Sequence, residues 1–282
     1  MRQMTAVAML LFALSAQAQT GEGDRHWALR AEGSQGGRAK SEHIDAAIAG
    51  YQKAVTQNAN DLAAQWKLLR ALRFKGAYVA GSVDQKKQVY TQAKDAGERA
   101  LAVVRRLVAA KGVDPVKAKE KQVADAARSI PGAAEVYLWD AVNWGEWALA
   151  YGKMAAARQG AADRIRREAT IARLVDARLE GGTPSRVLGR LHDQTPRIPF
   201  ITGWASGREA VQFLTESQKI DPANKITMVF LAEAMVSQSS SSKPQAMQLL
   251  RTAVSAPNEP EFFVEQSAAQ AEARELLKKW GA

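Results

Sequence analysis

Residues 206–235 constrain the fold more than any other stretch of this 282-residue chain. They open with Ser206-Gly-Arg-Glu209, a capping-box pattern. In such a box the serine hydroxyl accepts the glutamate backbone N–H, and the glutamate side chain reaches back to the serine. Ile220-Asp-Pro222 ends this helix, because proline disfavours helical geometry in the residue before it. A second helix is predicted from about Asn224, so the stretch predicts a helical hairpin.

Small and large apolar residues share the inner faces of this hairpin. Ala210 and Ala232 are predicted to let the two helices approach, while Leu214 and Leu231 fill the space beside them. This order of small and large residues is typical of a tetratricopeptide (TPR) unit. Less complete versions recur along the chain, and an amphipathic helix over 261–280 resembles the polar-backed cap of a helical solenoid. We therefore predict an all-α fold, a superhelical array of degenerate TPR-like hairpins with a C-terminal capping helix.

The N-terminus carries the pattern of a signal peptide at residues 1–18. Arg2 supplies the positive charge, Ala6 to Ala16 form a short apolar core, and Ala16-Gln-Ala18 is a small-residue cleavage site. The apolar run is too short to span a bilayer. We expect a periplasmic or secreted protein, with a flexible leader at 19–40 and a single TPR-like domain at 41–282.

Composition removes several classes of function. The chain has no cysteine, which excludes disulfides, cysteine metal sites, cysteine nucleophiles and a lipid-acceptor cysteine after the signal. Its net charge of +10 favours acidic surfaces or anionic ligands as partners. Export argues against nucleic acid.

The sequence contains no recognisable catalytic or metal-binding pattern. The three histidines lie far apart and form no H-E-x-x-H motif. No G-x-S-x-G elbow, Walker loop or dinucleotide-binding glycine pattern occurs. We therefore predict a non-catalytic protein without metal or cofactor.

The most apolar helix of the mature chain is predicted between Gly132 and Gly152. One interpretation is a central helix buried on most sides, with its polar groups bonded to neighbouring backbone. The other is a cavity wall in which tryptophans hold a small molecule and polar side chains orient it. The side chains that share this mixed arc are Trp139, Asp140, Asn143, Glu146 and Trp147.

A proline-rich connection over 194–204 is expected to fold back over the helices. Its large apolar residues Ile198, Phe200 and Trp204 are predicted to be buried anchors. Arg197 and Trp204 from this connection complete the candidate binding set.

Three stretches together resemble one known family. They are LGRLHDQTPRIPFITGWASGREAVQFLTESQKIDPANKITMVFLAEAM, VYLWDAVNWGEWALAYGK and EARELLKKW. The chain is similar, over about residues 41–280, to the T component of tripartite TRAP transporters, and more distantly to the TPR domain of regulators of microtubule dynamics. The likeness is most specific at Leu188-Gly-Arg190, Pro196-Arg-Ile-Pro199 and Leu231-Ala-Glu233.

The resemblance implies degenerate helical repeats around a cleft or pore, no catalysis, and a solute-binding protein as partner. Small hydrophobic ligands have been suggested for the family. T components are often lipoproteins, and this chain departs from them because it has no cysteine to carry a lipid.

Three functions follow from these patterns. The first is an adaptor that binds another exported protein, for which a TRAP-type solute receptor is the candidate. The second is a carrier of a small hydrophobic or anionic ligand in the tryptophan-lined cavity. The third is a structural envelope protein that binds acidic polymers through the outward arginines Arg164, Arg167 and Arg173.

Overall fold

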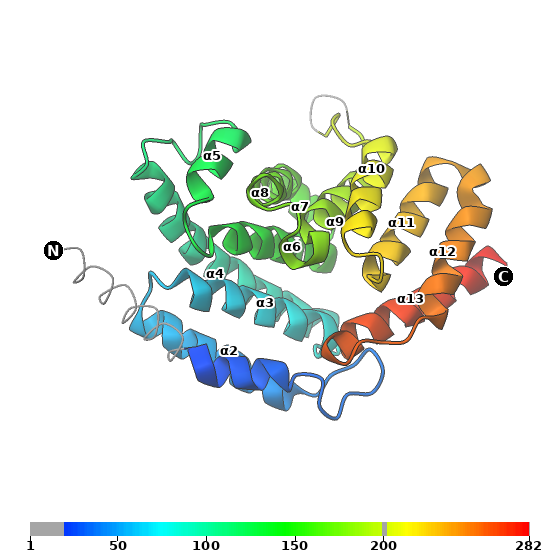
Figure 1. Cartoon of the computed structure of the whole chain (residues 1–282), viewed down its shortest axis with the longest axis horizontal. Coiled ribbons are helices and arrows are strands. Elements are labelled where there is room, and N and C mark those ends of the chain that lie inside the picture. The colour runs from blue at the N-terminus through cyan, green and yellow to red at the C-terminus, as the bar shows by residue number, and fades with distance from the viewer. Residues whose placement is uncertain (1–19, 199–201, 282) are drawn as a thin grey trace.

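The computed structural model of the chain describes residues 20–198 and 202–281, so the predicted signal peptide at residues 1–18 lies outside the described residues. Every named element in the described part is a helix, which confirms the all-α class (Figure 1). Residues 20–28 are helical as well. The larger helices are α2 Ser41–Gln57, α3 Leu62–Tyr78, α4 Val83–Ala109, α6 Ala133–Tyr151, α8 Ala161–Val175, α9 Leu179–Gln194, α10 Gly207–Ile220, α11 Lys225–Gln238, α12 Lys243–Ser255 and α13 Phe263–Trp280. The short ones are α5 Glu120–Ala127, α7 Lys153–Arg158, η1 Ser240–Ser242 and η2 Pro260–Phe262.

Helix starts and stops lie where local side-chain chemistry puts them. The Ser206 hydroxyl accepts the Glu209 N–H at the start of α10, and Asn224 caps α11 by accepting the Thr227 N–H. Helix α10 ends at Ile220, just before Asp221 and Pro222. These caps satisfy backbone donors that have no partner within the helix. The predicted hairpin over 206–235 is confirmed.

Two interruptions of the helices follow from local chemistry. The chain after Asp114 forms a turn, and α5 begins at Glu120. The Asp114 carboxylate accepts the N–H groups of Val116 and Lys117, which favours a turn over a helix there. Glu180, Gly181 and Gly182 have positive φ and form a kink inside α9.

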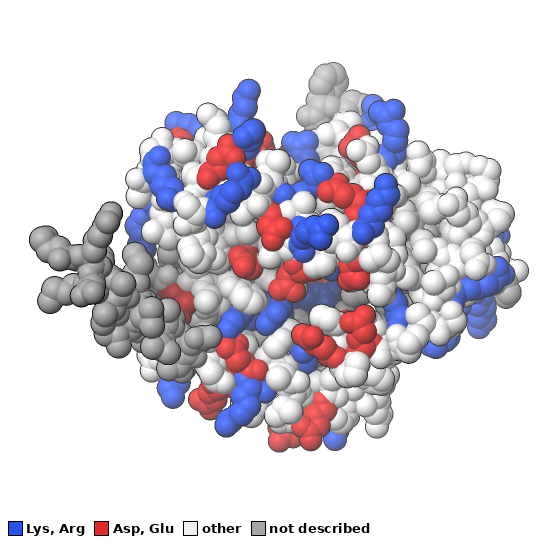
Figure 2. Space-filling model, in the orientation of Figure 1, with Lys and Arg blue, Asp and Glu red and all other residues white. Residues whose placement is uncertain are grey.

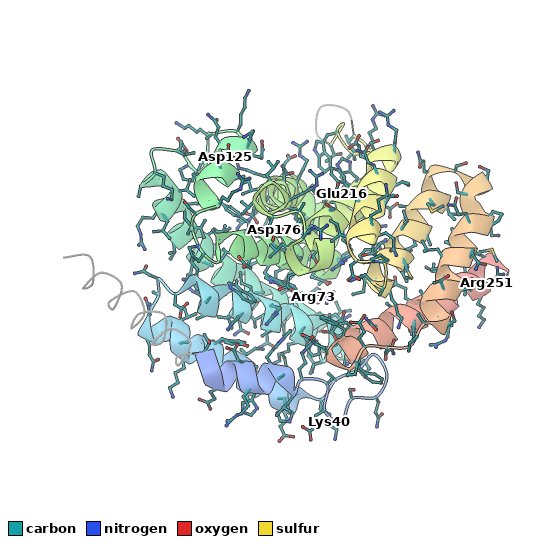
Figure 3. The ribbon with its side chains drawn as sticks, in the orientation of Figure 1. Lys40, Arg73, Asp125, Asp176, Glu216 and Arg251 are labelled. Atoms are coloured by element: carbon teal, nitrogen blue, oxygen red, sulfur yellow. The ribbon has the colours of Figure 1, made fainter. Side chains whose placement is uncertain are left out.

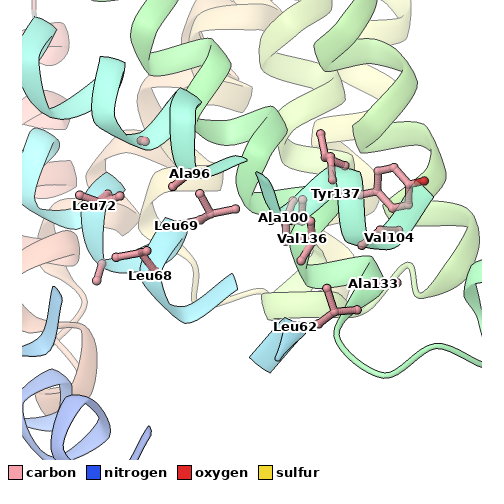
Figure 4. Close-up of a cluster of buried hydrophobic side chains, with 14 of the residues drawn as sticks. Leu62, Leu68, Leu69, Leu72, Ala96, Ala100, Val104, Ala133, Val136 and Tyr137 are labelled. Carbon is pink, nitrogen blue, oxygen red and sulfur yellow. The ribbon is translucent and has the colours of Figure 1, made fainter. Parts of the chain in front are cut away.

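Each helix packs mainly on its near neighbours along the chain, in the order α2, α3, α4, α6, α8, α9, α10, α11, α12 and α13. The largest hydrophobic cluster joins the first half of this series (Figure 4). In it, leucines of α3 such as Leu69 meet small residues of α4 such as Ala100 and the apolar face of α6 around Val136. Burial of these side chains stabilises the fold at about 25 cal/mol per Å² of apolar surface removed from water.

The two ends of the described chain contact each other. Figure 1 shows the loop that precedes α2 beside the start of α13. Arg30 in this loop is only 3% exposed, and its guanidinium binds the Glu265 carboxylate at 3.1 Å and the Glu261 carbonyl oxygen. Helix α13 therefore packs on the first segment as well as covering α11 and α12.

The segment 19–40, predicted to be a flexible leader, is described from residue 20, and several of its side chains contact α2 and α3. The Asp24 carboxylate accepts hydrogen bonds from the Tyr51 hydroxyl at 2.9 Å and from Lys67 Nζ at 2.7 Å. Arg38 donates to the carbonyl oxygens of Val79 and Ala80 after α3. The glycine-rich composition suggested mobility, but charged side chains fix the segment to α2 and α3. Among the described residues, no helix is both long and apolar enough to cross a membrane.

We predict that Gly189→Ala destabilises the fold. A Cβ atom at Gly189 in α9 would lie 2.5 Å from Leu214 Cγ and 3.0 Å from the Ala210 carbonyl oxygen, both in α10. Such overpacking costs about 1–3 kcal/mol. Gly145→Ala in α6 is the control, because a Cβ there meets nothing within 4 Å and alanine raises helix propensity. Denaturant unfolding should separate the two variants; equal stabilities would contradict this packing.

A second prediction concerns the contact between the two ends. Arg30→Met leaves the half-buried Glu265 carboxylate without its cation, so the free energy of unfolding should fall by about 3 kcal/mol. Arg38→Met removes an arginine from the same loop, but an exposed one, and should cost about 1 kcal/mol or less. Thermal unfolding measures both. Equal losses would show that the closure at Arg30 adds no special stability.

Candidate functional site

Helix α6 lies at the centre of the molecule. It packs on α3, α4, α8 and α9, and glycines 132 and 152 flank it at positive φ. Because α6 has neighbours on several sides, its polar side chains point to different partners. The predicted binding set on this helix is therefore divided.

Trp139 and Asn143 face the first half of the fold. Trp139 is half-buried against the largest hydrophobic cluster. Asn143 is fully buried, and its amide donates to the Leu69 carbonyl oxygen at 3.0 Å and to the Trp139 carbonyl oxygen at 2.8 Å. Both side chains thus pack within the protein.

Asp140 meets a different neighbour, a charged cluster between α4, α6 and α8. It is 0% exposed and accepts from Arg164 at 2.8 Å. Arg164 also binds Glu168 at 3.0 Å and Glu98. A Cβ atom at Gly97 in α4 would lie 1.7 Å from Asp140 Oδ1, so only glycine leaves room for this carboxyl group.

Asp140 and Glu168 form a carboxyl pair. Both are buried, and Asp140 Oδ1 and Glu168 Oε2 have no hydrogen-bond partner among the described residues. A proton held by one carboxyl group and shared with the other would supply the missing donor. Burial raises the pKa of Glu168 well above its usual range, and the nearby Asp140 charge raises it further. Burial also raises the pKa of Asp140, although the bond to Glu168 and the charge of Arg164 oppose this.

This pair predicts a pH dependence of stability. The folded chain holds the Glu168 proton more tightly than the unfolded chain, whose carboxyl titrates near 4.5. The stabilisation is therefore complete below that pH and is lost as pH rises through the folded pKa, at about 1.4 kcal/mol per pH unit. Glu168→Gln should flatten this slope.

The control is Glu98→Gln, which changes an exposed carboxylate on the same arginine. This variant should keep the wild-type slope. Urea unfolding at a series of pH values gives both slopes. A Glu168→Gln protein that follows the wild-type curve would disprove the shared proton.

Trp147 belongs to an aromatic stack that a lysine closes. It is 4% exposed and stacks on Tyr151, with ring centroids 4.6 Å apart. Lys94 Nζ of α4 lies 3.9 Å from the ring centroids of both Trp144 and Trp147. The negative faces of the two indole rings attract the ammonium group electrostatically. The space beside Trp147 is thus occupied by the protein's own lysine.

Arg197 and Trp204 are distant from α6 in sequence, and their contacts are with other residues. Arg197 is exposed and lines a surface hollow of about 320 Å³ with His192 and Asp193. Trp204 is half-buried and donates its indole N–H to Asp163 Oδ1 at 3.1 Å. Of the predicted anchors in this connection, Ile198 is 45% exposed, which contradicts the prediction, and Phe200 lies outside the described residues.

Glu146, the last member of the set, leads to a group of residues that we did not predict. Its carboxylate binds Arg73 of α3 at 3.0 Å, and Arg73 also donates to the Tyr78 hydroxyl at 2.9 Å. Figure 3 shows Arg73 in the middle of the molecule, and Figure 2 shows acidic and basic side chains gathered over the same region. We call Arg70, Arg73, Arg186 and Arg190 the central arginine cluster.

Each of the other arginines of this cluster comes from a helix that borders the centre. Arg70 of α3 lies 3.5 Å from the Glu180 carboxylate, and Arg190 of α9 lies 2.6 Å from Glu233 of α11. Arg186, also in α9, is discussed below. The sequence signal was present as arginines one turn apart, at 70 and 73 and at 186 and 190. No pattern in the sequence indicated that α3 and α9 face one centre.

A comparison of the chain with models of known protein families finds no match, and a comparison with curated proteins finds none.

Proposed function

We propose that this chain is a non-catalytic, exported adaptor that binds another exported protein, with a TRAP-type solute-binding protein as the candidate partner. One surface carries this proposal. Leu149 and Met154, at the junction of α6 and α7, are each 70% exposed, and Tyr151 between them is exposed as well. Exposed apolar residues this close together in the chain are candidates for a protein-binding surface. We call these three residues the α6–α7 corner.

The charge around the corner indicates the kind of partner. Residues 147–162 contain no acidic side chain, whereas Lys153 and Arg158 are basic and exposed. Lys87 of α4 lies over the Tyr151 ring, with its Nζ 5.5 Å from the centroid. A partner surface with an apolar centre and an acidic rim complements such a corner. The predicted signal peptide and the resemblance to T components support an exported partner.

The other two hypotheses receive less support. The carrier hypothesis requires a cavity lined by Trp139 and Trp147. However, Trp139 packs on the core and Lys94 occupies the space beside Trp147. The hypothesis of a structural envelope protein requires arginines that face the solvent. Instead, the three predicted ones are half-buried and lie within 4 Å of carboxylates: Arg164 of Glu98, Arg167 of Glu120 and Arg173 of Glu216.

The test has two steps. Native mass spectrometry of the tagged protein from periplasmic extract identifies a stoichiometric partner, whose affinity is then measured with both purified proteins. The double variant Leu149→Ser/Met154→Ser should weaken that affinity by about thirtyfold, since buried interface anchors contribute about 2 kcal/mol.

The control is Val116→Ser, which removes an apolar side chain of similar exposure outside the corner. It should leave the affinity unchanged. An unchanged affinity in the double variant would show that the α6–α7 corner is not the binding surface. If no specific exported partner is found, the proposal that this protein is an adaptor is overturned.

A further inference from the structure

Arg186 is an exception among the arginines of the described residues. Ten of these arginines are buried or half-buried, and nine of the ten lie within 4 Å of a carboxylate oxygen. Arg186 has no carboxylate of the described residues at that distance. The nine paired ones are Arg30, Arg70, Arg73, Arg105, Arg164, Arg166, Arg167, Arg173 and Arg190.

Neutral hydroxyl groups hold the Arg186 guanidinium in place. It donates to Thr183 Oγ1 at 2.6 Å and to Thr227 Oγ1 of α11 at 3.1 Å. Both threonine hydroxyls donate their own protons elsewhere, to the Glu180 carbonyl oxygen and to Asn224 Oδ1. These bonds fix the orientation of the guanidinium without a contact ion pair to a carboxylate of the described residues, and further N–H donors remain.

Arg73 adds positive charge near Arg186. Burial and the charge of Arg73 together lower the pKa of Arg186 from 12.5 to about 10, although the charges of Asp221 and Glu180 oppose this shift. Arg73 itself is held by Glu146 and Tyr78. Arg186 is half-buried and so keeps some contact with solvent.

The backbone that carries Arg186 is strained. Glu180, with φ of 47°, is the one non-glycine residue with positive φ in the described chain. Together with Gly181 and Gly182 it turns α9 before Arg186. Such a conformation costs about 1–3 kcal/mol and persists where the surrounding structure imposes it. The turn places the guanidinium beside Thr227 and toward Arg73.

We propose that Arg186, with Arg73 beside it, binds the oxyanion group of a small molecule, a carboxylate or a phosphate, at the centre of the protein. The planar guanidinium matches two oxygens of such a group, and the anion supplies the missing negative charge. Because the α6–α7 corner is not involved, this site goes beyond the proposed adaptor function and does not depend on it.

The test uses acetate and inorganic phosphate as probes. The full-length protein is titrated with each sodium salt in a calorimeter, at an ionic strength kept constant with sodium chloride. We expect saturable binding of at least one probe, and the tighter one identifies the group that the site prefers. Arg186→Gln should weaken that binding about tenfold or more, because a hydrogen bond to a charged group is lost.

Two further variants separate binding from folding and from general charge. Arg186→Lys keeps the charge without the fork and should bind with intermediate affinity. Arg251→Gln removes an exposed arginine of α12, far from Arg73 in Figure 3, and should bind as the wild type does. If neither probe binds the wild type, or if Arg186→Gln binds equally well, the proposal is overturned.

Should Arg186→Gln fail to fold, the thermal unfolding midpoint of the wild type and of Arg186→Lys decides. A bound anion stabilises the folded state, so the better probe should raise the wild-type midpoint more than it raises that of Arg186→Lys. Equal rises in both proteins, or none, would likewise overturn the proposal.

Discussion

The buried contact of Arg30 with Glu265 is the constraint on which the arrangement of the chain depends. It joins the segment before α2 to α13, and the Arg30 guanidinium also lies 4.3 Å from the centre of the Trp27 ring. An array of helices that contact mainly their neighbours can remain open at both ends. Here the ends meet, so the helices surround a centre that carries many charges. Charges half-buried in this way need partners, which explains the frequency of ion pairs around α3, α6 and α9.

Local sequence signals predicted the helices well. They did not predict the contact between the two ends of the described chain. The caps at Ser82, Ser206 and Asn224, and the stop at Pro222, depend on residues within a few positions of each other. The contact between Arg30 and Glu265 spans 235 positions, and no local pattern indicates it. Composition even pointed the other way, because glycine and charge between Gly21 and Lys40 are typical of a mobile segment.

The candidate site shows the same limit. Helical periodicity correctly placed Asp140, Asn143 and Glu146 on one arc of α6, but an arc does not determine a common partner. Asp140 turns to Arg164 of α8, Asn143 to the backbone of α3, and Glu146 to Arg73. Which neighbour each side chain meets depends on how four other helices pack around α6, and that packing is set by contacts distant in sequence.

A charge without a partner is informative because this protein pairs its other half-buried arginines so consistently. Arg186 could have been replaced by an apolar residue if its role were only to join α9 to α11, since replacing buried charges by apolar groups is often neutral or stabilising. Instead it is oriented by the hydroxyls of Thr183 and Thr227, next to another cation and after a strained turn at Glu180. The neighbouring cation and the strained turn oppose folding, while the oriented guanidinium favours an anion at this position.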